Sequence, residues 1–97
     1  MKIIALEHEL PNATADGFQQ YAKDEAKKVW ELVQAGVVRE TYFRADRSEA
    51  VLVLECRTVD EAREALSTLP FVKNQLITFE LISLIAYPGF ERLFEKE

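Results

Sequence analysis

The chain has 97 residues, 48% of them hydrophobic, with only three glycines and three prolines, so we expect one packed domain over residues 1–97. A net charge of −5 without a lysine or arginine cluster argues against nucleic-acid binding. The longest apolar run, around Leu81 to Tyr87, is too short to cross a bilayer, and no signal peptide precedes the first strand pattern. We therefore expect a cytoplasmic protein that binds neither nucleic acid nor membrane.

The first third of the chain predicts a strand and then a long helix. The run from Lys2 to Glu9 is typical of a strand, and Leu10-Pro11-Asn12 closes it as a loop. Residues from about Thr14 to Gln34 follow a helical period, and Gly36 is the glycine expected after a helix.

The middle of the chain predicts a β-hairpin. Val37 to Arg44 alternates well enough for a strand, the polar run Ala45 to Ser48 indicates a turn, and Glu49 to Arg57 is a second strand.

The last third predicts a helix and a final strand. Thr58 and Glu61 have the spacing of a capping box, with Thr58 as N-cap and Glu61 reaching back. This box opens a helix that ends before Pro70. The longest strand is expected over Leu76 to Tyr87, and Pro88-Gly89 would separate it from a short helix over Phe90 to Lys96.

The element order β-α-β-β-α-β is that of the ferredoxin-like fold, an α+β four-stranded antiparallel sheet with two helices on one face. Both faces of this sheet are expected to be apolar. Val51 and Val53 alternate with Leu52 and Leu54, and the last strand offers two apolar sets as well (Phe79, Leu81 and Ile85 against Ile82, Leu84 and Ala86). The face without helices needs a cover, and a second subunit is the simplest one.

Glu25 is the most informative single residue. An α-helix turns by about 100° per residue, which places Phe18, Ala22, Val29 and Leu32 on one apolar stripe of the long helix. Glu25 projects from the middle of this stripe. A carboxylate aimed into a core needs a partner, a changed pKa or a hydrated pocket. We interpret Glu25 as a general acid or base in a pocket lined by Phe18, Ala22 and Val29. The alternative is a structural ion pair or a glutamate at a wet edge.

Arg39 is the predicted partner of Glu25. It alternates with Val37, Thr41 and Phe43, and if that side of the strand faces the helices, Arg39 meets Glu25 and Thr41 and Phe43 line the pocket. Arg39 would then bind a substrate carboxylate, although a plain salt bridge is the alternative. Tyr42, on the opposite side with Val38, is expected at an interface or in the core.

His8 is the only histidine and lies near a strand end, where it would act as a proton shuttle or ligand contact; a structural or solvated role is the alternative. Cys56 is expected to be a buried, inert thiol. One histidine and one cysteine do not make a zinc constellation, and the chain has no glycine-rich phosphate loop, so we expect no metal and no cofactor.

The run from Val59 to Phe71, together with Leu10-Pro11, Glu25, Gly36 and Arg39, resembles the muconolactone isomerase-like group of dimeric α+β barrels, over roughly Leu10 to Pro88. This resemblance implies a ferredoxin-like protomer that pairs through its sheet face, sometimes in larger rings. It also implies an enzyme that moves a proton in an unsaturated lactone without metal or organic cofactor. Asn12-Ala13 stands here where that family has a His-Asp pair, and Ala26 where it has a lysine.

The sequence thus predicts a small homo-oligomer whose Glu25–Arg39 pocket binds a small anionic or carbonyl-bearing metabolite, with cofactor-free, isomerase-like proton transfer. Two alternatives stay open. One is a non-catalytic ligand-binding or scaffold protein of the same fold, and the other is a monooxygenase-like dimeric barrel, cofactor-free or linked to haem through His8.

Overall fold

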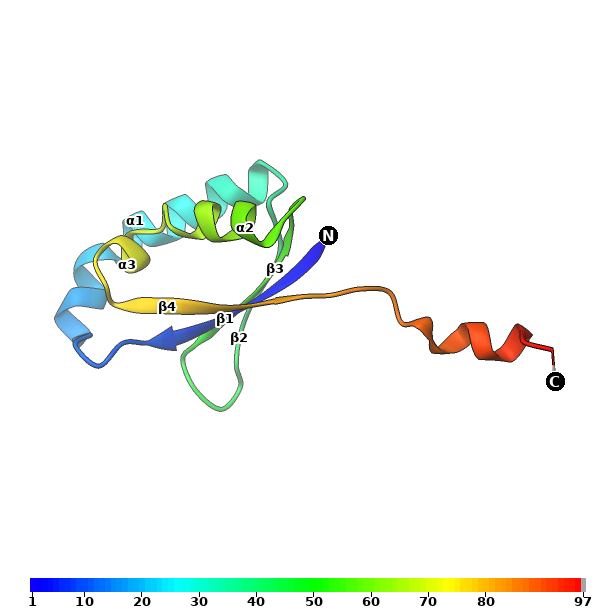
Figure 1. Cartoon of the computed structure of the whole chain (residues 1–97). Helices are drawn as coiled ribbons and strands as arrows, with labels where there is room; N and C mark the ends of the chain where they lie inside the picture. The colour runs from blue at the N-terminus through cyan, green and yellow to red at the C-terminus, as the bar shows by residue number, and fades with distance from the viewer. Residues whose placement is uncertain (97) are drawn as a thin grey trace.

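The computed structural model describes residues 1–96, and it confirms the predicted ferredoxin-like element order (Figure 1). None of the helices within these residues has the length and hydropathy needed to cross a bilayer. The elements are β1 (Lys2–Glu9), α1 (Ala15–Gln34), β2 (Val38–Phe43), β3 (Ala50–Glu55), α2 (Val59–Leu66), α3 (Pro70–Lys73), β4 (Ile77–Ser83) and the 3₁₀ helix η1 (Pro88–Phe94).

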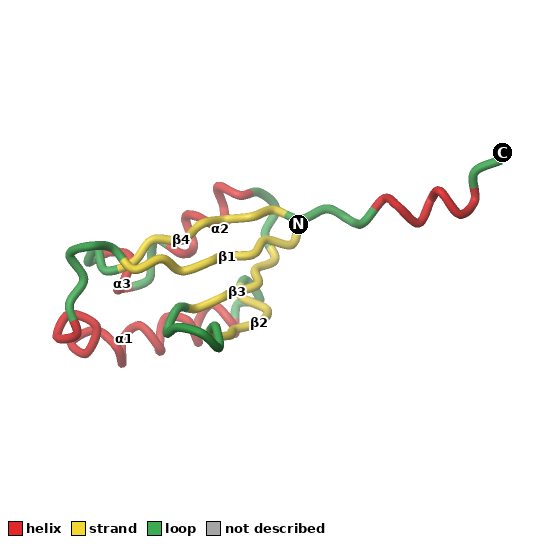
Figure 2. Tube along the Cα trace, turned by 90° about the horizontal axis from the view of Figure 1, so that it is seen from below, coloured by secondary structure: helices red, strands yellow, loops and turns green. Residues whose placement is uncertain are grey.

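The four strands form one antiparallel sheet in the order β2-β3-β1-β4, and α1, α2 and α3 cover one of its faces (Figures 1 and 2). Helix α1 packs on the side of β2, whereas α2 and α3 pack on the side of β4. The core lies between these two layers. Its strand residues are Ile3, Ala5, Val38, Leu52 and Leu54, and its helix and loop residues include Leu32, Ala62, Leu66 and Leu69.

Both ends of α1 are fixed by local interactions. The Thr14 hydroxyl accepts a hydrogen bond from the Gly17 backbone N–H at 3.1 Å, as an N-cap does. At the other end, Gly36 adopts a φ of 79°, and the N–H groups of Gly36 and Val37 return to the carbonyls of Val33 and Leu32. This is the Schellman arrangement, which a glycine in the left-handed region favours. The predicted role of Gly36 is confirmed.

Helix α2 has only half of the predicted capping box. The Thr58 hydroxyl accepts from the Glu61 N–H at 3.1 Å, as expected. The Glu61 carboxylate does not reach back, however, because it accepts a hydrogen bond from Arg57 Nε at 3.2 Å instead.

The predicted helix ends before Pro70, but Pro70 also begins a further helix, α3. It occupies the first turn of α3, where its missing N–H costs nothing and its fixed φ suits the helix. The sequence pattern gave no sign of this four-residue helix.

The last strand is shorter than predicted. Strand β4 ends at Ser83, since its partner β1 begins at Lys2, and the final backbone contact is the Leu84 N–H to the Lys2 carbonyl at 2.9 Å. The terminal helix also starts earlier than expected. Pro88 and Gly89 belong to η1, which ends at Phe94.

The middle of the sheet face without helices is apolar, as predicted, although His8 and Glu80 make its end polar. The register places Ile4 between Val53 and Ile82, and Leu6 beside Val51. Each of these five side chains projects away from the helices, because their neighbours in sequence fill the core. We call this set the open face.

Residues 84–96, the C-terminal arm, leave the body of the molecule in line with β4 (Figure 1). The long axis of the chain is therefore 62 Å, against 29 and 20 Å for the other two. The rings of Tyr87 and Phe90 meet edge to face at 5.0 Å, and a side chain on Gly89 would collide with the Tyr87 ring. Ile85 and Phe94 are 87% and 83% exposed, so the arm presents apolar side chains without a partner in this chain.

Candidate functional site

A cavity of about 540 Å³ lies between α1 and the sheet, a size in the usual range for small-ligand sites. Its walls are mostly apolar and come from α1 and all four strands. They are formed by Glu7, Ala22, Glu25, Ala26, Val29, Trp30, Val33, Thr41, Tyr42, Phe43, Ala50, Leu52 and Phe79.

Glu25 projects from α1 into this cavity. Its carboxylate accepts a hydrogen bond from the Phe71 backbone N–H at 2.9 Å, and none of the ion pairs within residues 1–96 includes it. Burial raises the pKa of Glu25, and the hydrogen bond from Phe71 offsets part of that rise. The result is a half-buried carboxyl group without a paired cation, suited to taking up and releasing a proton.

Glu7 is a second carboxylate in the same cavity, and it was missing from the sequence prediction. It follows Ile3 and Ala5 on the inward face of β1, where its partner in the register is Phe79. Burial raises its pKa most. The Ala50 backbone hydrogen bond lowers that pKa, whereas Glu49, Glu25 and Glu9 raise it further by repulsion. The period of two from Ile3 would have revealed this position.

The structure brings most of the predicted pocket residues together with Glu25. Ala22, Val29, Thr41 and Phe43 all line the cavity. Phe18 does not. Its ring packs edge to face on Phe71 at 5.1 Å, and it lines a smaller neighbouring cavity of about 380 Å³, whose walls share Glu7 and Phe43 with the first.

Arg39 lies outside the cavity, so the predicted Glu25–Arg39 pair does not form. Strand β2 has a bulge between Val38 and Glu40, which leaves Arg39 without a partner in the ladder. Its Nε donates to the Gly36 carbonyl at 2.6 Å. The bulge also overturns the expected alternation, because Val38 is buried in the core on the same side as Thr41 and Phe43.

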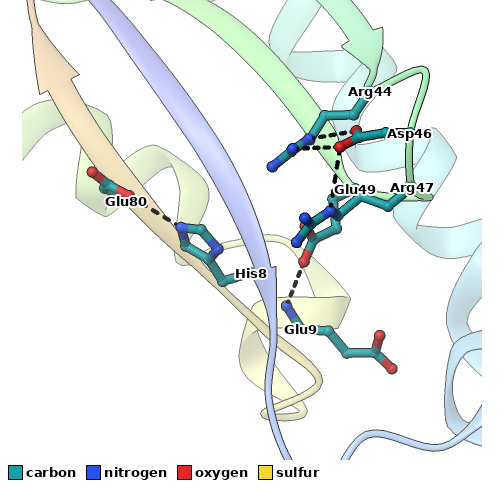
Figure 3. Close-up of polar contacts among 7 residues, drawn as sticks. All are labelled: His8, Glu9, Arg44, Asp46, Arg47, Glu49 and Glu80. Atoms are coloured by element: carbon teal, nitrogen blue, oxygen red, sulfur yellow. Dashed lines mark hydrogen bonds and ion pairs between the residues drawn. The ribbon is translucent and has the colours of Figure 1, made fainter.

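His8 faces the opposite side of the sheet from Glu25. Figure 3 shows its ring beside Glu80, with Nε2 at 3.1 Å from the carboxylate. The alternation along β1 explains this placement, since Glu7 takes the inward position next to it. His8 can neither shuttle a proton in the cavity nor ligate a haem held there.

Polar contacts tie the hairpin end to β1, next to the cavity (Figure 3). Glu49 pairs with Arg47 at 3.5 Å and accepts from the Glu9 N–H at 3.2 Å, while Arg44 makes two hydrogen bonds to Asp46. No group of three or more His, Cys, Asp or Glu side chains in residues 1–96 is placed to hold a metal ion.

Exposed aromatic side chains surround the cavity mouth. Trp30, Tyr42 and Phe43 are 60%, 57% and 73% exposed. The Tyr42 hydroxyl donates to Glu40 at 2.7 Å, and this hydrogen bond raises the Tyr42 pKa. Aromatic rings at an entrance shield a ligand from water only when another protein surface packs over the rings.

The chain has a ferredoxin-like α+β fold that is similar to the fold of muconolactone isomerase. Muconolactone isomerase itself superposes with a TM-score of 0.74, at 20% identity, over 92% of this chain and 93% of that one. A 5-chloro-2-hydroxyhydroquinone dehydrochlorinase from Burkholderia phenoliruptrix, in complex with 2,5-dihydroxybenzoquinone, gives a TM-score of 0.62 at 14% identity, over 92% and 98% of the two chains. By sequence, no family model and no curated protein matches. The predicted likeness is therefore confirmed for the fold.

Proposed function

We propose that this protein is a cytoplasmic homo-oligomer that binds a small carbonyl-bearing metabolite in the Glu25 cavity and transfers protons on it without a cofactor. One observation carries the proposal, namely the half-buried Glu25 carboxylate, held by one backbone N–H in an apolar cavity without a paired cation. A general base works best when its pKa lies near the operating pH, and burial moves Glu25 in that direction.

The charges in the cavity favour a neutral ligand over an anionic one. Two carboxylates, Glu7 and Glu25, open into it, and Arg39, the residue expected to bind a substrate anion, lies elsewhere. Both similar structures carry names that refer to small oxygenated ring compounds. An unsaturated lactone or a related cyclic ketone fits these constraints.

Two apolar surfaces support the homo-oligomer. Within residues 1–96 no helix packs on the open face of the sheet, and the C-terminal arm exposes large apolar side chains and leads away from its own body (Figure 1). Burying such apolar surfaces against a second copy removes them from water and so favours association. We propose a dimer through the open faces, with the arms packing on neighbouring subunits.

The test is solvent-deuterium exchange into a panel of small unsaturated lactones and cyclic ketones, followed by NMR. The native protein should exchange at least one of these compounds. Glu25→Gln keeps the shape and the acceptor for the Phe71 N–H but removes the basicity, so it should abolish exchange and retain binding.

Glu31→Gln is the matched control, because Glu31 lies on the same helix, is exposed and pairs with Lys28. It should exchange as the native protein does. If Glu25→Gln exchanges as fast as the native protein, Glu25 is not the base. If the native protein binds compounds of the panel but exchanges none, the protein is a ligand-binding protein and not an enzyme.

A further inference from the structure

Glu7 is a charged residue at an inward-facing position of β1, where a hydrophobic residue is expected. It is the third inward residue of β1, after the fully buried Ile3 and Ala5, and it is half-buried in the cavity between the sheet and α1. The Ala50 backbone lowers the pKa of the Glu7 carboxyl group, but burial raises it more. A half-buried glutamate of this kind costs stability, so its presence needs an explanation.

Glu7 and Glu25 reach the same cavity from opposite walls, one from the sheet and the other from α1. No ion pair within residues 1–96 includes either of them. The other charged groups that act on Glu7 are Glu9 and Glu49, and Arg47 is paired with Glu49. Because Glu25, Glu49 and Glu9 all repel a charge on Glu7, Glu7 and Glu25 cannot easily be ionised together.

We propose that Glu7 is a second acid–base group of this cavity and works with Glu25 in opposite protonation states, Glu7 as the acid and Glu25 as the carboxylate. The assignment rests on the function proposed above and extends it from one base to a pair. Glu7 carries the proton because Glu49 and Glu9, besides Glu25, repel its charge, whereas no third carboxylate within residues 1–96 acts on Glu25 in this way and the Phe71 N–H favours its ionised form.

The pair completes a proton shift without any further reactant. Glu25 removes a proton from the carbon that lies between the carbonyl and a β,γ double bond of the ligand, so that C–H bond breaks and its electron pair forms a dienolate with the negative charge on the carbonyl oxygen. The Glu7 carboxylic acid then gives its proton to the γ carbon, the carbonyl double bond re-forms, and the carbon–carbon double bond comes to lie between the α and β carbons. Nothing is oxidised or reduced. Glu7 is left ionised and Glu25 protonated, and proton exchange with water at the cavity mouth restores the first state.

The first test needs no ligand. Protein labelled with ¹³C at the glutamate carboxyl carbons is titrated by NMR, and the signals of Glu7 and Glu25 are assigned from their absence in Glu7→Gln and Glu25→Gln. If the two groups are coupled, the Glu7 midpoint lies at higher pH in the native protein than in Glu25→Gln. A Glu7 midpoint that is the same in both proteins overturns the pair.

The second test separates the two roles on a compound that the native protein converts. Glu7→Gln should reduce isomerisation by about 100-fold, the usual contribution of a positioned acid. It should keep deuterium exchange at the carbon that Glu25 deprotonates, and Glu7→Asp should recover part of the isomerisation. Glu80→Gln, on the other face of the same sheet, is the control and should be as active as the native protein.

The outcomes distinguish this proposal from the one on which it rests. Exchange that needs Glu25, with isomerisation unchanged in Glu7→Gln, overturns the role of Glu7 and leaves Glu25 as the only base. Coupled titration in a protein that exchanges no compound overturns catalysis by the pair along with the proposed function. Coupled titration together with the loss of isomerisation in Glu7→Gln supports the pair.

Discussion

The Glu25 carboxylate accepts a hydrogen bond from the backbone N–H of Phe71, at 2.9 Å, and so caps a helix other than its own. Phe71 lies in the first turn of α3, whose N-cap residue Leu69 offers no side-chain acceptor. A carboxylate is favoured at such a helix start, since it satisfies a free N–H group and meets the positive end of the helix dipole. The residue proposed to do chemistry thus also fixes the loop before β4.

This contact predicts a difference between two substitutions at Glu25. Gln keeps an oxygen for the Phe71 N–H, and Ala does not. We expect Glu25→Ala to be less stable than Glu25→Gln by about 1 kcal/mol, the usual value of a lost helix cap. Urea unfolding of both variants measures the difference, and equal stabilities would mean that the cap does not contribute.

Stability should depend on pH through Glu7. Its pKa is raised in the folded state, chiefly by burial and then by repulsion from Glu49, Glu25 and Glu9, so the folded form binds its proton more tightly than the unfolded form does. The stability that this proton contributes is complete below the unfolded pKa of about 4.3 and is lost as the pH rises through the folded value. We therefore expect the free energy of unfolding of Glu7→Gln, relative to that of the native protein, to increase as the pH rises from about 4 toward neutral.

Denaturant unfolding at several pH values measures this effect, with the native protein and Glu7→Gln compared at each pH. Comparing them at equal pH cancels the titration of all other groups. A difference that stays constant or shrinks as the pH rises would contradict the assignment. Glu80→Gln, which removes a carboxylate outside the cavity, provides the reference for the loss of one charge.

Arg39 and Glu25 should behave independently. They do not meet, because Arg39 lies in the bulge of β2 and bonds to Gly36. In a double-mutant cycle with Arg39→Ala and Glu25→Gln, the unfolding free energies should add to within about 0.5 kcal/mol. A larger coupling energy would place the arginine in the cavity after all.

The chain should form at least a dimer. Light scattering at micromolar concentration is expected to give a mass of at least twice the 11.1 kDa of one chain. A monomer under these conditions would contradict the proposal that a second subunit packs on the open face.

The C-terminal arm should contribute to association. Phe94 is 83% exposed in the single chain, so Phe94→Asp leaves its folding nearly unchanged but places a charge in the proposed contact. We expect this variant to dissociate at higher protein concentration than the native protein does. Glu91→Gln in the same 3₁₀ helix is the control and should associate normally.

The elements with a strong local signal were predictable. The period of α1, the Thr14 to Gly36 boundaries and the hairpin of β2 and β3 follow from side chains that interact with near neighbours in sequence. The two apolar faces of the sheet followed from alternation alone.

Where the structure differs from the sequence-based predictions, the physical causes are mostly absent from the local sequence pattern. Alternation along β2 assumes a regular ladder, and the bulge at Arg39 breaks that assumption. The strand pattern continues past Ser83, but β1 has no further residue to pair with it. Glu7 is an exception, because the period of two from Ile3 and Ala5 already places it on the inward face of β1. Only the fold shows that this position lies across from Phe79 and lines a cavity beside α1.

The bulge in β2 also determines where this strand tolerates a change of length. Arg39 is one residue more than the ladder needs, and it is accommodated at the start of the strand, so Thr41 and Phe43 stay in phase with Leu52 and Ala50 on the cavity side. A chain that lacks Arg39 keeps that phase and is expected to keep the cavity. One residue inserted between Thr41 and Tyr42 would instead turn Phe43 to the open face and place Tyr42 opposite Ala50, in the ladder position that Phe43 occupies now. Homologous chains of different length are therefore expected to differ directly after Gly36 and not within the second half of β2.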